Sequence, residues 1–139
     1  MSRAMFIGRW QPFHNGHKWL ISQKLNEGKP ILICVRDIPP DDNNPFTTKQ
    51  TIEMLKKVYE TENVEVIKIP DIESVNFGRG VGYKIIEHKP ENDIYNISAT
   101  DIRKKILNND SSWKEHVDEK IQEDIKKYIY NFYDHYKGA

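Results

Sequence analysis

The chain has 139 residues with 21 basic and 21 acidic side chains, so its net charge at neutral pH is zero. This length suffices to bury a hydrophobic core, and we expect one domain spanning residues 1–139. The balanced charge disfavours a general nucleic-acid or membrane surface, so any anion site must be local. No stretch approaches the roughly 18 apolar residues of a membrane helix, and the single cysteine, Cys34, favours a cytoplasmic protein.

The first predicted elements are a strand and a helix joined by a short turn. An apolar run over residues 4–7 stops at Gly8, and helical spacing begins at Asn15. His14 and His17 flank Asn15 and Gly16, which we expect to open the helix with free backbone N–H groups that attract anions. Residues 1–26 carry four cationic side chains and no acidic one, which favours a polyphosphate ligand at this turn.

The rest of the pattern alternates strands and helices. We expect strands over residues 31–35 and 64–69, helices beginning near Thr47 and Ser98, and an amphipathic helix between Val117 and Tyr136 that packs on the sheet. Residues 37–45 and 71–83 are expected to be irregular, and residues 94–97 to form a last short strand. This order predicts an α/β fold with a Rossmann-like parallel sheet, helices on both faces, and ligands at the carboxyl ends of the strands.

One motif dominates the turn after the first strand. Residues 8–17 read Gly-Arg-Trp-Gln-Pro-Phe-His-Asn-Gly-His. This segment resembles the HxGH signature of the nucleotidyltransferase superfamily, most closely the form found in archaeal-type nicotinamide mononucleotide adenylyltransferases. The resemblance implies that His14 and His17 contact a triphosphate and stabilise the transition state, and that the nucleotide is also bound by Gly8, Arg9, Gln11, Phe13 and Gly16. Histidines that are merely hydrogen-bonded within a turn are the alternative interpretation.

A second segment supports the first. Residues 97–103, Ile-Ser-Ala-Thr-Asp-Ile-Arg, resemble the Ile-Ser-x-Thr-x-Ile-Arg motif of the same superfamily. Hydroxyl groups, a helix N-terminus and a forked guanidinium suit the β- and γ-phosphates of a nucleoside triphosphate. The resemblance implies nucleotide binding by Ile97, Ser98, Thr100 and Arg103, with a catalytic role for Arg103. The alternative is an ordinary capping box between Ser98 and Asp101 on a surface helix.

The resemblance weakens in the part of the chain expected to hold the acceptor. Asn44-Pro45-Phe46-Thr47 and Pro70-Asp71-Ile72 resemble stretches of the adenylyltransferases, but those enzymes typically have a basic residue before Pro-Phe-Thr. Here Asn43 and Asn44 stand at that place, and Arg36 or Lys49 is the expected replacement. The passage from Asp71 to Ser98 is much shorter than in the family, and its glycines at 78, 80 and 82 favour a flexible turn over a phosphate loop. Acceptor contacts are predicted for Arg36, Asp71, Asn76, Phe77 and Arg79.

The two motifs together imply an enzyme that moves an adenylyl group from ATP to a small phosphate-bearing acceptor, first of all nicotinamide mononucleotide, and releases pyrophosphate. Because the acceptor phosphate is itself the nucleophile, catalysis needs positioning and charge neutralisation rather than a nucleophilic side chain. We expect Mg²⁺ to enter with ATP without a dedicated protein metal site, and no nucleic-acid or membrane partner; homo-oligomer formation stays open. The alternatives are a cytidylyltransferase, an adenylyltransferase for another phosphomonoester such as phosphopantetheine, and an idle nucleotide-binding regulatory module.

Overall fold

The computed structural model describes residues 2–137. Its centre is a parallel sheet with the strand order β1-β2-β3, formed by β1 (Ala4–Gly8), β2 (Ile31–Asp37) and β3 (Val64–Pro70). The register places Ala4 opposite Ile31, and Ile31 opposite Val64. The predicted parallel α/β sheet is therefore confirmed, and the carboxyl ends of its strands lie at one edge.

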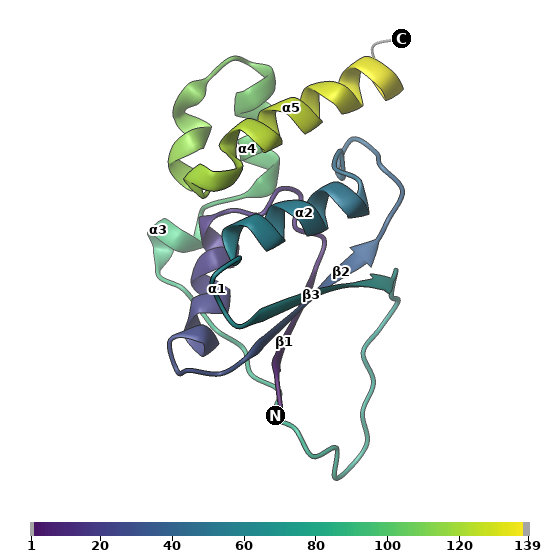
Figure 1. Ribbon diagram of the computed structural model, residues 1–139, viewed down its shortest axis with the longest axis vertical. Helices are drawn as coiled ribbons and strands as arrows, with labels where there is room; N and C mark the ends of the chain where they lie inside the picture. The colour runs from purple at the N-terminus through teal and green to yellow at the C-terminus, as the bar shows by residue number, and fades with distance from the viewer. Residues whose placement is uncertain (1, 138–139) are drawn as a thin grey trace.

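Helices flank this sheet (Figure 1). The helix α1 (Asn15–Leu25) connects β1 to β2, and α2 (Thr48–Val58) connects β2 to β3. Two further helices, α4 (Ala99–Leu107) and α5 (Gln122–Phe132), lie together at the end of the molecule opposite the N-terminus. None of the helices within residues 2–137 has the length and apolarity that crossing a membrane requires.

Local sequence signals explain where the helices begin. The predicted capping box at the start of α2 is present: Gln50 N–H donates to Thr47 Oγ1 (3.1 Å), and Thr47 N–H donates to Gln50 Oε1 (2.9 Å). Each bond pairs a backbone N–H that the first helical turn leaves without an intrahelical acceptor. The amphipathic face of α2 then buries Thr51, Met54 and Leu55 against the core.

The core is one cluster that joins the sheet to all the longer helices. Most of its buried strand residues come from β2, whose Ile31, Ile33 and Val35 are each at most 1% exposed, and Phe6 of β1 joins them. Predicted apolar positions of the C-terminal segment join it, since Ile121, Ile125 and Ile129 belong to the cluster. The site described below is therefore built on elements that share a single packed interior.

Two of the predicted elements differ in the structure. The expected strand over residues 94–97 is wrong: α3 (Asn92–Tyr95) is a short helix, with Tyr95 N–H donating to Glu91 O (2.9 Å). A short apolar run does not distinguish strand from helix, and local helical bonds here pair the backbone without a neighbouring strand. The C-terminal segment also begins later than expected. Two short 3-10 helices, Ser111–His116 and Glu119–Ile121, precede α5, and a π-helical turn, Tyr133–Lys137, follows it.

A long connection without helix or strand runs over residues 71–91, as expected for most of its length. It leaves β3, passes toward the N-terminal end of the molecule and returns to α3 (Figure 1). Most of its side chains are exposed, including Val75, Phe77 and Tyr83. We refer to residues 71–91 as the connecting loop.

Candidate active site

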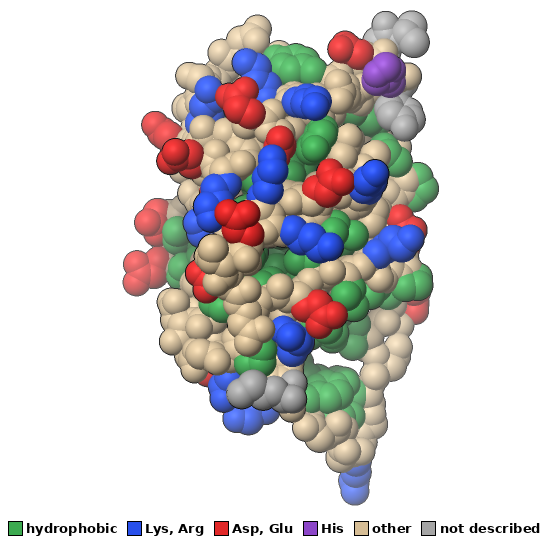
Figure 2. Space-filling model, viewed as in Figure 1, with side chains coloured by type: hydrophobic (Ala, Val, Ile, Leu, Met, Phe, Trp, Pro, Cys, Tyr) green, Lys and Arg blue, Asp and Glu red, His purple; other side chains and the backbone are tan. Residues whose placement is uncertain are grey.

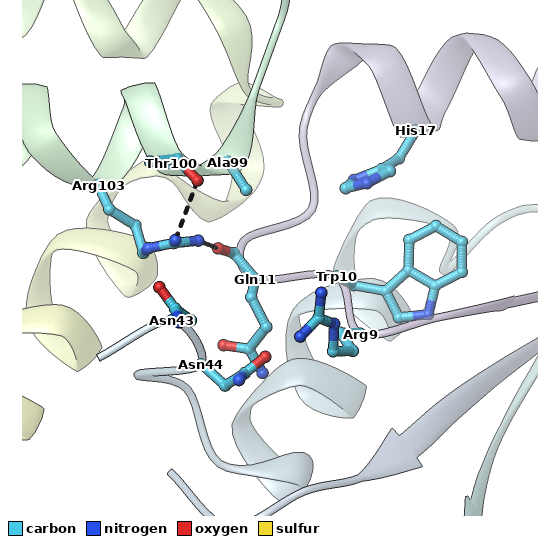
Figure 3. A pocket seen from close by; sticks show the side chains of 9 residues that line it. All are labelled: Arg9, Trp10, Gln11, His17, Asn43, Asn44, Ala99, Thr100 and Arg103. Carbon is cyan, nitrogen blue, oxygen red and sulfur yellow. Dashed lines mark hydrogen bonds between the residues drawn. The ribbon is translucent and has the colours of Figure 1, made fainter. Parts of the chain in front are cut away.

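A pocket of about 300 Å³ lies at the carboxyl edge of the sheet. Three separate segments form its walls: the turn after β1 together with the start of α1, the loop before α2, and the first turns of α4 (Figure 3). The side chains that line it are those of Arg9, Trp10, Gln11, His17, Asn43, Asn44, Ala99, Thr100 and Arg103. The two sequence motifs, far apart along the chain, thus share one cavity.

The two histidines of the first motif cap the helix that carries them. His14 is the N-cap residue of α1, and its Nδ1 accepts hydrogen bonds from Gly16 N–H (3.0 Å) and His17 N–H (3.4 Å). His14 N–H in turn donates to His17 Nδ1 (3.2 Å). The expectation that the first backbone N–H groups of the helix are open to an anion is therefore wrong for Gly16 and His17, because the His14 ring accepts from both.

This capping pattern decides the protonation of both rings. A ring nitrogen that accepts a hydrogen bond carries no proton, so each neutral imidazole keeps its proton on Nε2 as a donor. The rings stack with their centroids 3.7 Å apart. Burial, followed by the neighbouring His116, lowers the pKa of His14 to about 4. Burial, followed by the neighbouring His14, lowers the pKa of His17 to about 3. Both side chains are therefore uncharged hydrogen-bond donors at neutral pH.

Only one of the two rings reaches the pocket wall. His17 lines the cavity, whereas His14 is 7% exposed and lies behind it in the stack. Trp10 contacts His17 edge-on at 4.9 Å, and its Nε1 donates to the Cys34 carbonyl (3.2 Å). The predicted nucleotide contact Phe13 is only 1% exposed and does not line the pocket; its ring packs against His17 with centroids 5.8 Å apart.

Two glycines of the first motif leave room for these rings. A Cβ atom on Gly16 would lie 2.8 Å from His14 Cε1, and one on Gly8 would lie 2.8 Å from Trp10 Cε2. Both distances are shorter than van der Waals contact allows, so a larger residue would displace a ring. Neither glycine lines the pocket, and their part in the site is to admit the side chains around it.

Hydrogen bonds through Gln11 join the three walls. Gln11 Nε2 donates to Phe46 O (3.0 Å), and Phe46 N–H donates to Gln11 Oε1 (3.0 Å), which connects the turn after β1 to the loop before α2. The Gln11 carbonyl accepts from Arg103 Nη1 (2.6 Å), although the two residues are 92 positions apart. Arg103 Nη2 also donates to Thr100 Oγ1 (3.3 Å; dashed in Figure 3).

The pocket is lined by two arginines, Arg9 and Arg103, and by no acidic side chain. Arg103 is 8% exposed, and burial lowers its pKa from the ordinary arginine value. Within the described residues, none of the ion pairs involves Arg103 or Arg9. Elsewhere basic and acidic side chains are interspersed, as the face in Figure 2 shows. A buried guanidinium whose hydrogen-bond acceptors are a backbone carbonyl and a hydroxyl, with no direct ion pair, favours an anionic ligand.

The second motif contributes unequally to the pocket. Thr100 and Arg103 line it, and the neighbouring Ala99 does as well. Ser98 instead caps α4, since its Oγ accepts from Asp101 N–H (3.0 Å). Neither Ser98 nor the half-buried Ile97 lines the cavity.

The residues predicted to contact the acceptor do not line this pocket. Arg36 forms an ion pair with Asp71 (2.7 Å) and donates to the Ile72 carbonyl (3.2 Å). Asn76 donates to Ser74 Oγ (2.9 Å), while Phe77 is 62% exposed on the connecting loop and Arg79 is also exposed. Neither Arg36 nor Lys49 lines the cavity.

Comparison with known proteins agrees with this geometry. Residues 5–79 match a family model described as cytidylyltransferase-like. The chain is 34% identical over 140 residues to a nicotinamide-nucleotide adenylyltransferase of Methanococcus aeolicus, covering 81% of each chain. It is 31% identical over 159 residues to the enzyme of the same name from Sulfurisphaera tokodaii, covering 90% of this chain and 91% of the relative. The chain belongs to the cytidylyltransferase-like family. It is accordingly a nucleotidyltransferase, the enzyme class that the resemblance implied.

The alignment to the first of these relatives also shows that this chain lacks some of that protein's residues. The alignment to the Methanococcus aeolicus protein spans 140 positions but includes only 81% of this 139-residue chain. The relative therefore has residues with no counterpart here. The family model itself covers residues 5–79, which include the turn after β1 and the loop before α2. Arg103 lies outside this range.

Sequence reasoning did not assign four of the pocket side chains in this family member, those of Trp10, Asn43, Asn44 and Ala99. Asn43 and Asn44 were treated only as the absence of a basic residue, yet both line the cavity. Asn44 is 4% exposed, and its Nδ2 donates to Asp41 Oδ1 (2.9 Å). Their position just after a strand of a parallel sheet was the available signal, because ligands of such sheets bind beyond the carboxyl ends of the strands.

The pocket lining offers one histidine and no cysteine or acidic side chain as a ligand for a metal ion. Within residues 2–137, no group of three histidine, cysteine or acidic side chains could hold a metal ion. A divalent ion accompanying the nucleotide would therefore be held mainly by phosphate oxygens, which is how magnesium usually binds in phosphoryl-transfer sites.

Proposed function

We propose that this protein transfers the adenylyl group of ATP to the phosphate of nicotinamide mononucleotide and releases pyrophosphate. The main support is the pocket, which gathers a histidine donor, a hydroxyl group and two arginines around one cavity. The relatives named nicotinamide-nucleotide adenylyltransferase support the choice of both substrates.

In the proposed reaction an oxygen of the acceptor phosphate attacks the α-phosphorus of ATP. A new P–O bond forms, the bond to the β-phosphate oxygen breaks, and its electron pair leaves with pyrophosphate. Arg103 binds the β- and γ-phosphates and stabilises the leaving group, while His17 Nε2–H donates to an α-phosphate oxygen as charge develops. His14 acts from behind by holding the His17 ring and the first turn of α1 in place.

The neutral state of the two imidazoles suits this role. A neutral donor binds a phosphate oxygen without the desolvation cost of a second buried cation beside Arg103. The donors and the acceptor nitrogens are set by the capping bonds before the substrate arrives, so little reorganisation is needed during the reaction.

The proposal also assigns residues to the nucleotide and acceptor sites. Arg9, Gln11 and Thr100 line the pocket and contact the nucleotide directly. The other predicted nucleotide-binding residues hold these side chains in place: Gly8, Phe13, Gly16, Ile97 and Ser98. The substrate is MgATP, with the metal carried by its phosphates. Arg36, Asp71, Asn76, Phe77 and Arg79 remain the proposed acceptor contacts. We further propose one domain over residues 1–139 and a cytoplasmic location.

The experiment is a substrate matrix. The protein is incubated with MgCl₂, each of the four nucleoside triphosphates, and nicotinamide mononucleotide, phosphopantetheine or no acceptor, and pyrophosphate release is followed. We expect turnover with ATP and nicotinamide mononucleotide, with the dinucleotide as co-product in equal amount. Turnover only with CTP or only with another acceptor would assign a different substrate, and no turnover with any pair would contradict the proposal.

A further inference from the structure

One polar atom at the pocket has no partner. The Oδ1 atom of Asn44 is buried and makes no hydrogen bond, although its residue is only 4% exposed. Buried polar atoms in native proteins nearly always have a partner, so an orphaned acceptor beside a binding pocket indicates a donor that arrives there.

The orientation of the Asn44 amide is determined by its other bonds. Asn44 Nδ2 and Asn44 N–H both donate to Asp41 Oδ1, at 2.9 Å and 2.8 Å. A carboxylate only accepts hydrogen bonds, so the NH₂ group must face Asp41 and the amide oxygen must face the other way. In Figure 3 this oxygen points toward the side of the pocket where Arg9 lies.

The Arg9 guanidinium has N–H groups that can donate to this oxygen. Its side chain lines the same cavity and is exposed, and within the described residues its guanidinium forms no hydrogen bond or ion pair. It lies near the Asp41–Asn44 turn, because its charge contributes to the lowered pKa of Asp41, which the hydrogen bond from Asn44 lowers most. The five N–H donors of a guanidinium exceed what one phosphate group takes up.

We propose that Asn44 is a positioning residue for Arg9. When the triphosphate fills the pocket, the Arg9 guanidinium donates one N–H to Asn44 Oδ1 and directs its remaining N–H groups at the phosphates. Asn44 thereby orients a cation that comes from the turn after β1. The adenylyltransferases that this sequence resembles typically have a basic residue before Pro-Phe-Thr, on the loop before α2. This inference rests on the proposed function only in taking a nucleoside triphosphate as the ligand.

The test is a double-mutant cycle read by binding of MgATP, with no acceptor present. Asn44→Ser keeps a hydroxyl that can donate to Asp41 but removes the amide oxygen, and Arg9→Met removes the guanidinium while keeping the stem. We expect each single change to weaken MgATP binding about tenfold, the size of a hydrogen bond to a charged group. The double variant should bind no more than about twofold more weakly than Arg9→Met alone, because the two groups act through one contact.

Asn43→Ala is the matched control. Asn43 lines the same pocket and is exposed, so its effect should simply multiply with that of Arg9→Met. In steady-state assays Asn44→Ser should raise the KM for ATP while the KM for the acceptor stays within about twofold. Asn44→Ala serves as a second variant if Asn44→Ser does not fold, with thermal melting reporting the fold of each.

The possible outcomes separate this inference from the proposed function. Effects of Asn44→Ser and Arg9→Met that multiply fully would overturn the inference and leave the proposed function standing. Failure of the wild-type protein to bind MgATP would overturn both.

Discussion

The nucleotide pocket and the connecting loop are built in opposite ways. Around the pocket, Gln11, His14 and Arg103 are each at most 8% exposed, and hydrogen bonds join three distant segments. On the connecting loop, Val75, Phe77 and Tyr83 are each at least 60% exposed, although they are large apolar side chains. A preorganised site can hold a triphosphate without rearrangement. Exposed apolar side chains on an irregular segment instead indicate a surface that becomes buried when a ligand binds. We therefore expect the pocket to recognise the triphosphate and the loop to recognise the acceptor.

The strongest test of the rigid half is His17→Ala. Removing the Nε2–H donor is expected to lower kcat by about 10²–10³, the usual loss for one donor at a developing charge. Pyrophosphate release measures the effect. Lys18→Ala is the control, because Lys18 is the next residue of α1 and does not line the pocket. A His17→Ala enzyme within threefold of wild type would contradict the role given to this ring.

Replacing the fork of Arg103 should have the next largest effect. Arg103→Lys keeps the charge but cannot bond Gln11 O and Thr100 Oγ1 at once, so we expect kcat/KM for ATP to fall about 10- to 100-fold. The acceptor KM should change little. Steady-state kinetics with each substrate varied in turn provides the measurement, and an equal loss for both substrates would show that the fold, rather than the triphosphate contact, had been damaged.

The histidine pair makes stability depend on pH. In the unfolded chain His14 has a pKa near 6.5, while in the fold its pKa is about 4, so between these values the unfolded state binds more protons. The stability is complete above pH 6.5 and is lost as pH falls toward 4, by roughly 3 kcal/mol from His14. His17, with a pKa of about 3, extends the loss to lower pH. Urea unfolding of wild type and His14→Gln from pH 7 to 4 measures it; equal slopes in the two proteins would show that His14 is not the cause.

Changes in the connecting loop should have the smallest effect on the rigid half. Phe77→Ser removes a ring that is 62% exposed, so the free energy of unfolding should change by less than about 0.5 kcal/mol and MgATP binding by less than twofold. The KM for nicotinamide mononucleotide should rise. The same titrations on Asn76→Ala provide a second loop variant, and weakened ATP binding in either would break the division between the two regions.

The features that could be predicted from the sequence are those whose interacting residues lie close together along the chain. The capping box of Thr47 and Gln50, the helix beginning at Asn15 and the three strands follow from contacts between near neighbours. Residues 94–97 were misassigned because a run of four residues is compatible with either periodicity. The grouping of His17 with Arg103 was expected only through the motif resemblance, since spacing alone does not bring two segments together.

The sequence by itself determined the alternating α/β order, the family signature and the local caps, because these depend on periodicity and on residues three or four positions apart. Only the tertiary structure decided that Gln11 pairs with Phe46 and Arg103, that burial keeps the histidine rings uncharged, and that Asn44 holds an unpaired oxygen at the pocket. Those contacts join residues up to 92 positions apart, and burial sets their charge states. They arise from the path of the folded chain, and hence from the packing of the whole core.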